Sequence, residues 1–158
     1  MTDTTVRVLA SLLAATFAWA AVAKVISAGE WRAALNGYQM PLQVRGAAAI
    51  GVPILEAIVA VVLLTAPVRI GAALALALLT VFSLALVRAS MLRGPRVPCG
   101  CFGRSKEREV TAMLARNALI GCVAVVVLSV GDRLRLIGGL SAPGASDLVP
   151  LGLTLLGL

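Results

Sequence analysis

Four long apolar segments alternate along the chain with shorter charged or turn-forming stretches. They cover residues 6–26, 46–67, 70–87 and 111–130, and an α-helix needs about 20 such residues to cross the hydrocarbon core of a bilayer. Ala, Leu, Val and Ile fill them in continuous blocks, whereas the strands of a membrane β-barrel alternate apolar and polar positions. The pattern therefore predicts an all-α, polytopic membrane four-helix bundle.

The stretches between these segments differ in character. Residues 27–45 are amphipathic, so we expect them to lie at the membrane surface as a connector. Only a turn around Pro67 separates the second and third segments, which should therefore be antiparallel neighbours. Residues 90–111 are extensively charged, and residues 131–158 are turn-rich before a final apolar stretch at 148–158 that is short for a span. We expect this tail to pack on the bundle or lie at the interface, with a partial fifth helix as the alternative.

The first 28 residues share features with a signal peptide, because an apolar run follows a short polar start. The run is long for a signal peptide, however, and Asp3 offsets Arg7 where a signal peptide would be plainly basic. We therefore expect this segment to remain as the first span of a single transmembrane domain over residues 1–130.

Composition supports a membrane protein. The chain is 60% hydrophobic and 13% charged, with a mean hydropathy of +1.01, which leaves too little polar surface to cover a water-soluble globule. A net charge of +7 would favour a nucleic-acid partner in a soluble protein, but here Lys and Arg lie mainly at segment ends, as topology signals and headgroup anchors do. The chain has no histidine, which excludes His-based metal sites and catalytic triads, and with them most hydrolase mechanisms.

Four spans place residues 27–45 and 90–111 on one side of the membrane and both termini on the other. Ten Lys and Arg residues fall on the first side and four on the second. The ten are Lys24, Arg32, Arg45, Arg88, Arg93, Arg96, Arg104, Lys106, Arg108 and Arg116, and the four are Arg7, Arg69, Arg133 and Arg135. By the positive-inside rule we expect residues 90–111 on the cytoplasmic side of the plasma (inner) membrane.

Two cysteines in the charged stretch are the strongest candidates for chemistry. Only Gly100 separates Cys99 from Cys101, and glycine permits the unusual dihedral angles that would let the two thiols meet. A disulfide between them would close a small, strained ring, and strained exposed disulfides exchange easily. Cationic side chains nearby favour the thiolate, which is the nucleophile in exchange: Arg96, Arg104 and Lys106.

Other interpretations of the cysteines stay open. The pair could be incidental loop thiols without a role, or could bind Cu(I) or zinc, although the chain offers only Cys122 as a third thiol, so we expect a metal site to need a dimer. Cys122 lies within the last span, where a cysteine is expected to be buried as a small hydrophobic residue; a relay or resolving thiol is the alternative.

An acidic residue, Glu56, lies near the middle of the second segment, where an ionisable group is costly unless it is paired. Its candidate partners towards the same side are Lys24, Arg116 and Asn117. Two roles fit this residue equally well: proton handling or contact with a quinone, and a structural hydrogen bond between helices.

A run of Pro-Cys-Gly-Cys-Phe-Gly at residues 98–103 occurs together with several weaker features. These are Lys24 closing the first span, Tyr38 and Pro41 three residues apart, Pro53 and Glu56 three residues apart, and Arg116 and Asn117 at the start of the last span. In these features, over residues 6–130, the chain resembles the MauE family of methylamine-utilisation membrane proteins, which is related to the DoxX-like group of four-helix redox-associated proteins.

The resemblance implies a membrane helper in disulfide formation or thiol redox balance. It would serve an exported client, in methylamine users the small subunit of methylamine dehydrogenase, beside a thioredoxin-like protein. Cys99 and Cys101 would be the redox pair of a thiol-disulfide oxidoreductase, with quinone as a candidate electron acceptor, while Lys24, Glu56, Arg116 and Asn117 match the family pattern without an assigned role. The alternative is a non-catalytic assembly factor or scaffold for the thioredoxin-like partner. An exported client favours an outward-facing pair, whereas the charge distribution favours the cytoplasmic side.

Overall fold

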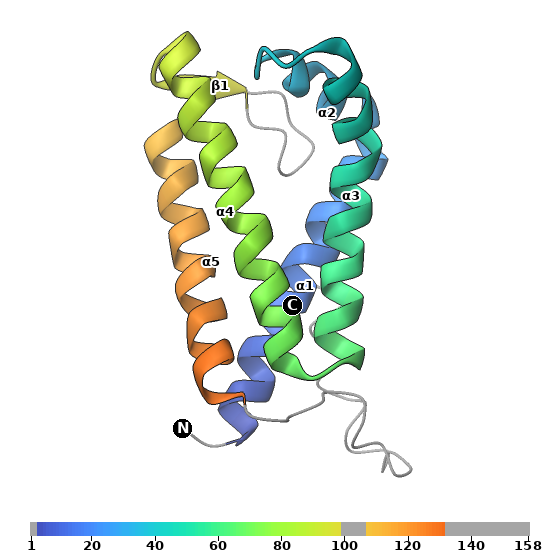
Figure 1. The fold of residues 1–158 in the computed structure, drawn as a ribbon, viewed down its shortest axis with the longest axis vertical. Helices are drawn as coiled ribbons and strands as arrows, with labels where there is room; N and C mark the ends of the chain where they lie inside the picture. The colour runs from blue at the N-terminus through green and yellow to red at the C-terminus, as the bar shows by residue number, and fades with distance from the viewer. Residues whose placement is uncertain (1–2, 99–106, 132–158) are drawn as a thin grey trace.

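The computed structural model describes residues 3–98 and 107–131 as a bundle of four long helices (Figure 1). The long helices are α1 (Asp3–Ile26), α3 (Leu42–Thr65), α4 (Val68–Arg93) and α5 (Val110–Val130). Each is long and apolar enough to cross a membrane, so the predicted all-α, polytopic membrane architecture is confirmed. The C-terminal tail, and with it the alternative of a fifth helix, lies outside the described residues.

The centre of the bundle is built from small and medium-sized apolar residues of all four long helices. Members of this core are Leu13, Ala14, Phe17, Val59, Ala60, Leu63, Ala75, Leu79 and Ala124. Alanines let helix backbones approach closely, as is common between helices in membranes. Many large apolar side chains instead point away from the bundle, among them Ile50, Leu84 and Leu119. Such an exterior suits a hydrocarbon solvent.

A short helix, α2 (Ala28–Asn36), occupies part of the connector between the first two spans. Its residues Trp31, Ala34 and Leu35 are buried, while Glu30 and Arg32 are exposed. The amphipathic pattern of this stretch therefore reflects packing of one helical face on the bundle, chiefly against α3, in addition to any contact with the membrane surface.

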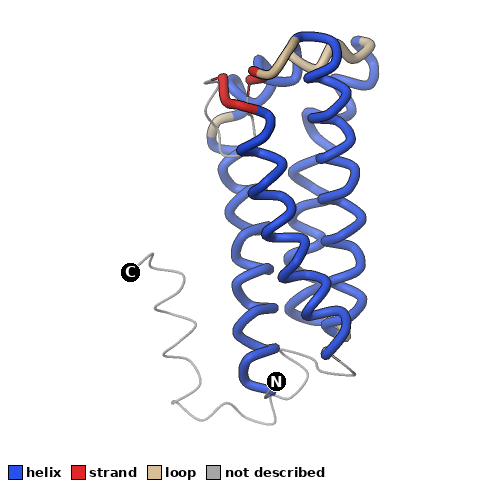
Figure 2. The backbone as a smooth tube through the Cα atoms, turned by 90° about the vertical axis from the view of Figure 1, so that its left-hand side faces the viewer, coloured by secondary structure: helices blue, strands red, loops and turns tan. Residues whose placement is uncertain are grey.

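Strands β1 (Arg96–Pro98) and β2 (Glu107–Glu109) pair antiparallel between α4 and α5, a feature that the sequence pattern did not predict. The strands and α2 lie at one end of the bundle, whereas the start of α1 and the turn between α3 and α4 lie at the other (Figures 1 and 2). The prediction that residues 27–45 and 90–111 share one side is thus confirmed for their described parts.

Helix α4 continues to Arg93, six residues past the predicted end of the third segment. The added turns are stabilised because Ala89, together with Leu86 in the turn before, is buried against Val110 and Met113 at the start of α5. Tertiary packing at this end therefore extends the helix into residues that the charge pattern alone predicted to be a loop.

The tight connection between α3 and α4 depends on Gly71. A Cβ atom added to Gly71 would lie 2.8 Å from the Cα of Leu63, a backbone atom that cannot rotate away. At Gly121 on α5, by contrast, the nearest atom to an added Cβ is the Cδ2 of Leu76 at 3.9 Å, an ordinary contact.

We therefore expect Gly71→Ala to lower the free energy of unfolding in detergent by about 1–3 kcal/mol, as overpacking does. Gly121→Ala is the matched control, and should be neutral or stabilising by up to about 1 kcal/mol, because alanine favours a helix. Denaturant unfolding followed by circular dichroism measures both. Equal stability of the two variants would contradict the close approach of α3 and α4.

Candidate functional site: a buried ion pair between two spans

The charged residues predicted within the spans meet between α1 and α3. Lys24 lies in the last turn of α1 and Glu56 lies within α3, and each residue is 2% exposed. The Nζ of Lys24 donates to both Oε1 and Oε2 of Glu56 at 2.7 Å, and approaches the carbonyl oxygen of Ala20 at 3.4 Å. Of the three partners predicted for Glu56, Lys24 is therefore in direct contact.

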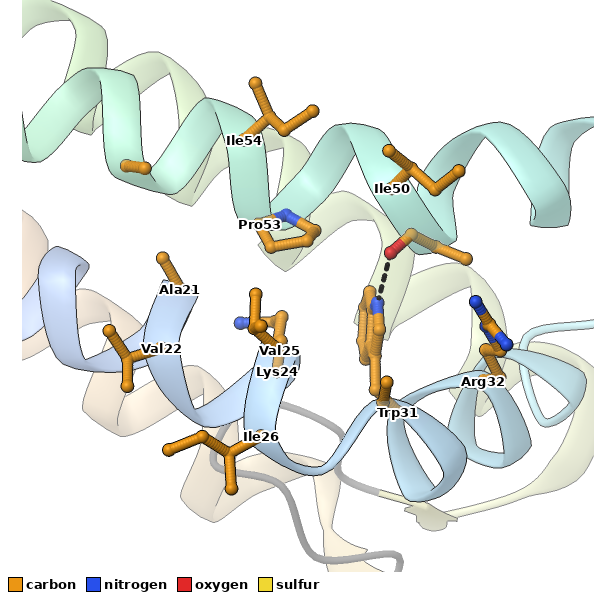
Figure 3. A pocket seen from close by; sticks show the side chains of 13 residues that line it. Ala21, Val22, Lys24, Val25, Ile26, Trp31, Arg32, Ile50, Pro53 and Ile54 are labelled. Atoms are coloured by element: carbon orange, nitrogen blue, oxygen red, sulfur yellow. Dashed lines mark hydrogen bonds between the residues drawn. The ribbon is translucent and has the colours of Figure 1, made fainter.

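A proline in α3 explains how α2 is attached beside this ion pair. Pro53 has no N–H, so the carbonyl of Ala49, four residues earlier, loses its helical hydrogen-bond donor. The Nε1 of Trp31 donates to that carbonyl oxygen at 3.1 Å (Figure 3). In an apolar environment this replacement matters, because an unsatisfied backbone group there costs several kcal/mol.

The same tryptophan also covers the ion pair. The Nζ of Lys24 lies 5.4 Å from the centre of the Trp31 ring, within the range of a cation–π interaction. The role of Trp31 was not predicted from the sequence. The sequence does contain a feature that could have indicated this role: a proline in the middle of a predicted span, which frees a backbone carbonyl, and a tryptophan in the connector before it, which can donate a hydrogen bond.

Glu56 also lines a small cavity of about 30 Å³ on the side of α4 and α5. Thr16, Arg116 and Asn117 line this cavity as well. Asn117 is buried, and its Nδ2 lies 3.4 Å from the Oγ of Ser83 on α4. The four polar residues predicted within or beside the spans therefore gather in one layer of the bundle, to which Thr16 and Ser83 also contribute.

The predicted redox pair, Cys99 and Cys101, lies outside the described residues. The chain enters that segment through β1 and leaves it through β2, and Pro98 and Glu107 are Cα partners in the ladder. Both ends of the cysteine-containing segment are thus held together at the end of the bundle that carries α2 (Figure 1).

The third cysteine is placed differently from the prediction. Cys122 is exposed on α5, so the expectation that it is buried in the core is wrong. The helical period turns it outward, while Ala124 two residues later is buried. Among the residues that the structure describes, no three His, Cys, Asp or Glu side chains lie close enough to hold a metal ion.

Within the described part of the chain, four apolar helices, two of which are joined by a buried ion pair, define a multi-pass, all-α membrane protein. The chain belongs to the MauE family, because the family model described as methylamine utilisation protein MauE matches residues 2–130. It is also similar to methylamine utilization protein MauE of Paracoccus denitrificans, with 30% identity over 118 residues, or 73% of this chain. The match covers 63% of that relative's length. No solved structure matches the chain significantly.

The ion pair makes a testable contribution to stability. Lys24→Met or Glu56→Met alone leaves an unpaired charge inside the bundle, which should lower the free energy of unfolding by about 3–5 kcal/mol. The double variant removes both charges and should cost less than either single variant. A denaturant titration in detergent measures the free energy of unfolding of the unchanged chain, of both single variants and of the double variant.

Arg88→Met is the control, since Arg88 is exposed and its replacement should change stability by no more than about 0.5 kcal/mol. A double variant as unstable as the sum of the two singles would show that Lys24 and Glu56 act independently.

Proposed function

We propose that this chain is a membrane thiol-disulfide redox protein of methylamine utilisation, with Cys99 and Cys101 as its working groups. The observation that supports it best is the antiparallel pairing of β1 and β2, which holds both ends of the Cys-Gly-Cys segment at one end of the bundle. Redox cysteines need access to a partner protein, and a short ribbon beyond the ends of two spans offers that access.

The proposed reaction is thiol-disulfide exchange. A thiolate of a reduced partner attacks the Cys99–Cys101 disulfide, and a mixed disulfide forms as the bond between the two cysteines breaks. The partner's second thiolate then resolves the mixed disulfide, so that the partner is oxidised and the pair is left as a dithiol. Regeneration removes two electrons and two protons from the dithiol to a membrane acceptor, for which quinone is the proposed class.

The proposed partners are a thioredoxin-like protein and an exported client. The relative from Paracoccus denitrificans is named a methylamine utilization protein, which supports a client in that process, such as the small subunit of methylamine dehydrogenase. Within the bundle we assign Lys24 and Glu56 to holding α1 on α3, because the ammonium and carboxylate groups bind each other at close range. Proton transfer or quinone contact at Glu56, Arg116 and Asn117 is the alternative role of that layer.

Three single replacements separate the working cysteines from the third one. We expect Cys99→Ser and Cys101→Ser each to abolish oxidation of the client, because exchange needs both sulfurs. Cys122→Ser should retain it, since that side chain is exposed on the outer face of α5. The fraction of client carrying its disulfides, measured by alkylation and mass shift in cells that express each variant, is the readout. Full client oxidation in Cys99→Ser cells would remove the basis of the proposal.

The side of the membrane decides the direction of electron flow, and we propose the cytoplasmic side because of the excess of positive residues at this end. There the pair would rest as a dithiol in a reducing compartment and pass electrons into the membrane. On either side the disulfide oxidises its partner; on the outer side this partner can be the exported client itself, whereas on the cytoplasmic side it is the thioredoxin-like protein.

A Cys122→Ser background leaves only Cys99 and Cys101 to label. A membrane-impermeant maleimide should then label the pair in inverted vesicles without prior reduction, and should not label it in intact cells. Labelling in intact cells only after reduction would instead place an oxidised pair outside.

A non-catalytic assembly factor is the second candidate, because the described part of this end exposes basic side chains suited to docking: Arg88, Arg93 and Arg96. Under that function, charge reversal at Arg104, Lys106 and Arg108 should abolish activity while both cysteine variants stay active. The redox function predicts that the cysteine variants fail.

A further inference from the structure

A groove of about 490 Å³ runs along the outside of the bundle between α1, α2 and α3 (Figure 3). This volume falls within the roughly 300–1,000 Å³ of small-molecule sites. Its lining is almost wholly apolar, and on α3 it extends from Ala49 to Ala57. Eight residues of helix correspond to about 12 Å, so the groove is elongated along the span.

The groove opens towards the surroundings of the bundle. Val25 on α1 and Ile50 and Ile54 on α3 line it, yet they are 67%, 63% and 52% exposed. In a protein whose long helices span a bilayer, such side chains meet lipid, so the molecules that reach this groove first are membrane lipids.

The polar atoms in the inner part of the groove are already engaged. The Nζ of Lys24 donates to Glu56, and the Nε1 of Trp31 donates to the carbonyl oxygen of Ala49. The nearest hydrogen-bond donors are therefore already bonded to other groups, which disfavours a ligand whose polar head lies deep in the groove. An aliphatic chain, which needs no hydrogen bond, fits this lining.

The exposed end of the groove is different, because it carries Arg32. This guanidinium belongs to the polar helix α2, at the end of the bundle where α1 stops. Within residues 3–98 and 107–131, Arg32 makes no hydrogen bond or ion pair. Arg32, which has no counter-charge among the described residues, lies at the end of an apolar groove and is therefore complementary to an amphiphile with an anionic head and an aliphatic tail.

We propose that the groove binds one acyl chain of an anionic phospholipid, with the phosphate of the lipid on Arg32. The charged head lies at the level of α2, and the chain follows α3 towards Ala57. The residues of this site lie on α1, α2 and α3, and the proposal does not depend on the chemistry of Cys99 and Cys101. It would seal the outer side of the contact between α1, α2 and α3, beside the Lys24–Glu56 ion pair.

The two tryptophans of the chain allow a direct test. Trp31 lines the groove, and Trp19 is 62% exposed elsewhere on α1, so Trp19→Phe leaves Trp31 as the only indole. The full chain with Trp19→Phe is reconstituted into vesicles of phosphatidylglycerol and phosphatidylcholine, with bromine on the acyl chains of one lipid or of the other. Bromine quenches the fluorescence of a nearby indole.

At equal mole fractions we expect Trp31 to be quenched by the brominated anionic lipid with a preference of about fivefold in apparent occupancy, as one basic residue at a membrane surface provides. Arg32→Gln should remove the preference. Arg88→Gln, which removes an exposed arginine of α4 outside the groove, should keep it.

Ala57→Leu, which places a larger side chain at the inner end of the groove, should reduce quenching by both lipids. Circular dichroism shows whether each variant is folded. Three results would overturn the proposal. They are equal quenching by the two lipids, a preference that survives Arg32→Gln, and no quenching by either lipid. The last result is expected if a second copy of the chain covers the groove. Quinone in place of phospholipid, found by mass spectrometry of the purified full chain, overturns it as well.

Discussion

Because the interior of the bundle has a low dielectric constant, the contact between Lys24 and Glu56 constrains how the rest of the fold is arranged. Either charge alone is costly there, and the two together are tolerated only while they remain close and well oriented. The pair therefore fixes the position of the end of α1 along α3 more precisely than apolar packing can. Apolar side chains pack acceptably in several registers, whereas an ammonium group and a carboxylate at 2.7 Å allow one.

Several neighbouring features can be understood as support for that contact. Pro53 removes a hydrogen bond from α3, and Trp31 restores it from α2, so the missing backbone bond becomes the attachment point of a second element. The attached indole then lies near the ammonium group of Lys24. The side chain of Trp31 thus serves two helices: it donates to the free carbonyl in α3, and its ring contacts the charge at the end of α1.

The sequence predicted the spans well because hydrophobicity is a property of each segment by itself. It also identified Lys24, Glu56, Arg116 and Asn117 as a related group, since polar residues in apolar segments are rare enough to be informative. It did not predict the strands on either side of the cysteines, because three-residue strands have no periodicity to detect. Nor did it predict that Cys122 is exposed, because residues 118–128 of α5 are all apolar or glycine, and their sequence alone does not distinguish the face that packs from the face that meets lipid.

The separation of the ion pair along the chain has a consequence for biosynthesis. Glu56 is synthesised 32 residues after Lys24, which at 5–20 residues per second corresponds to roughly two to six seconds. During that interval the ammonium group of Lys24 lacks the carboxylate that it binds in the bundle, so it is expected to stay in contact with water or lipid headgroups. The first helix can therefore take up its final depth only after the next span has left the ribosome, and the two enter the bilayer as a coupled unit.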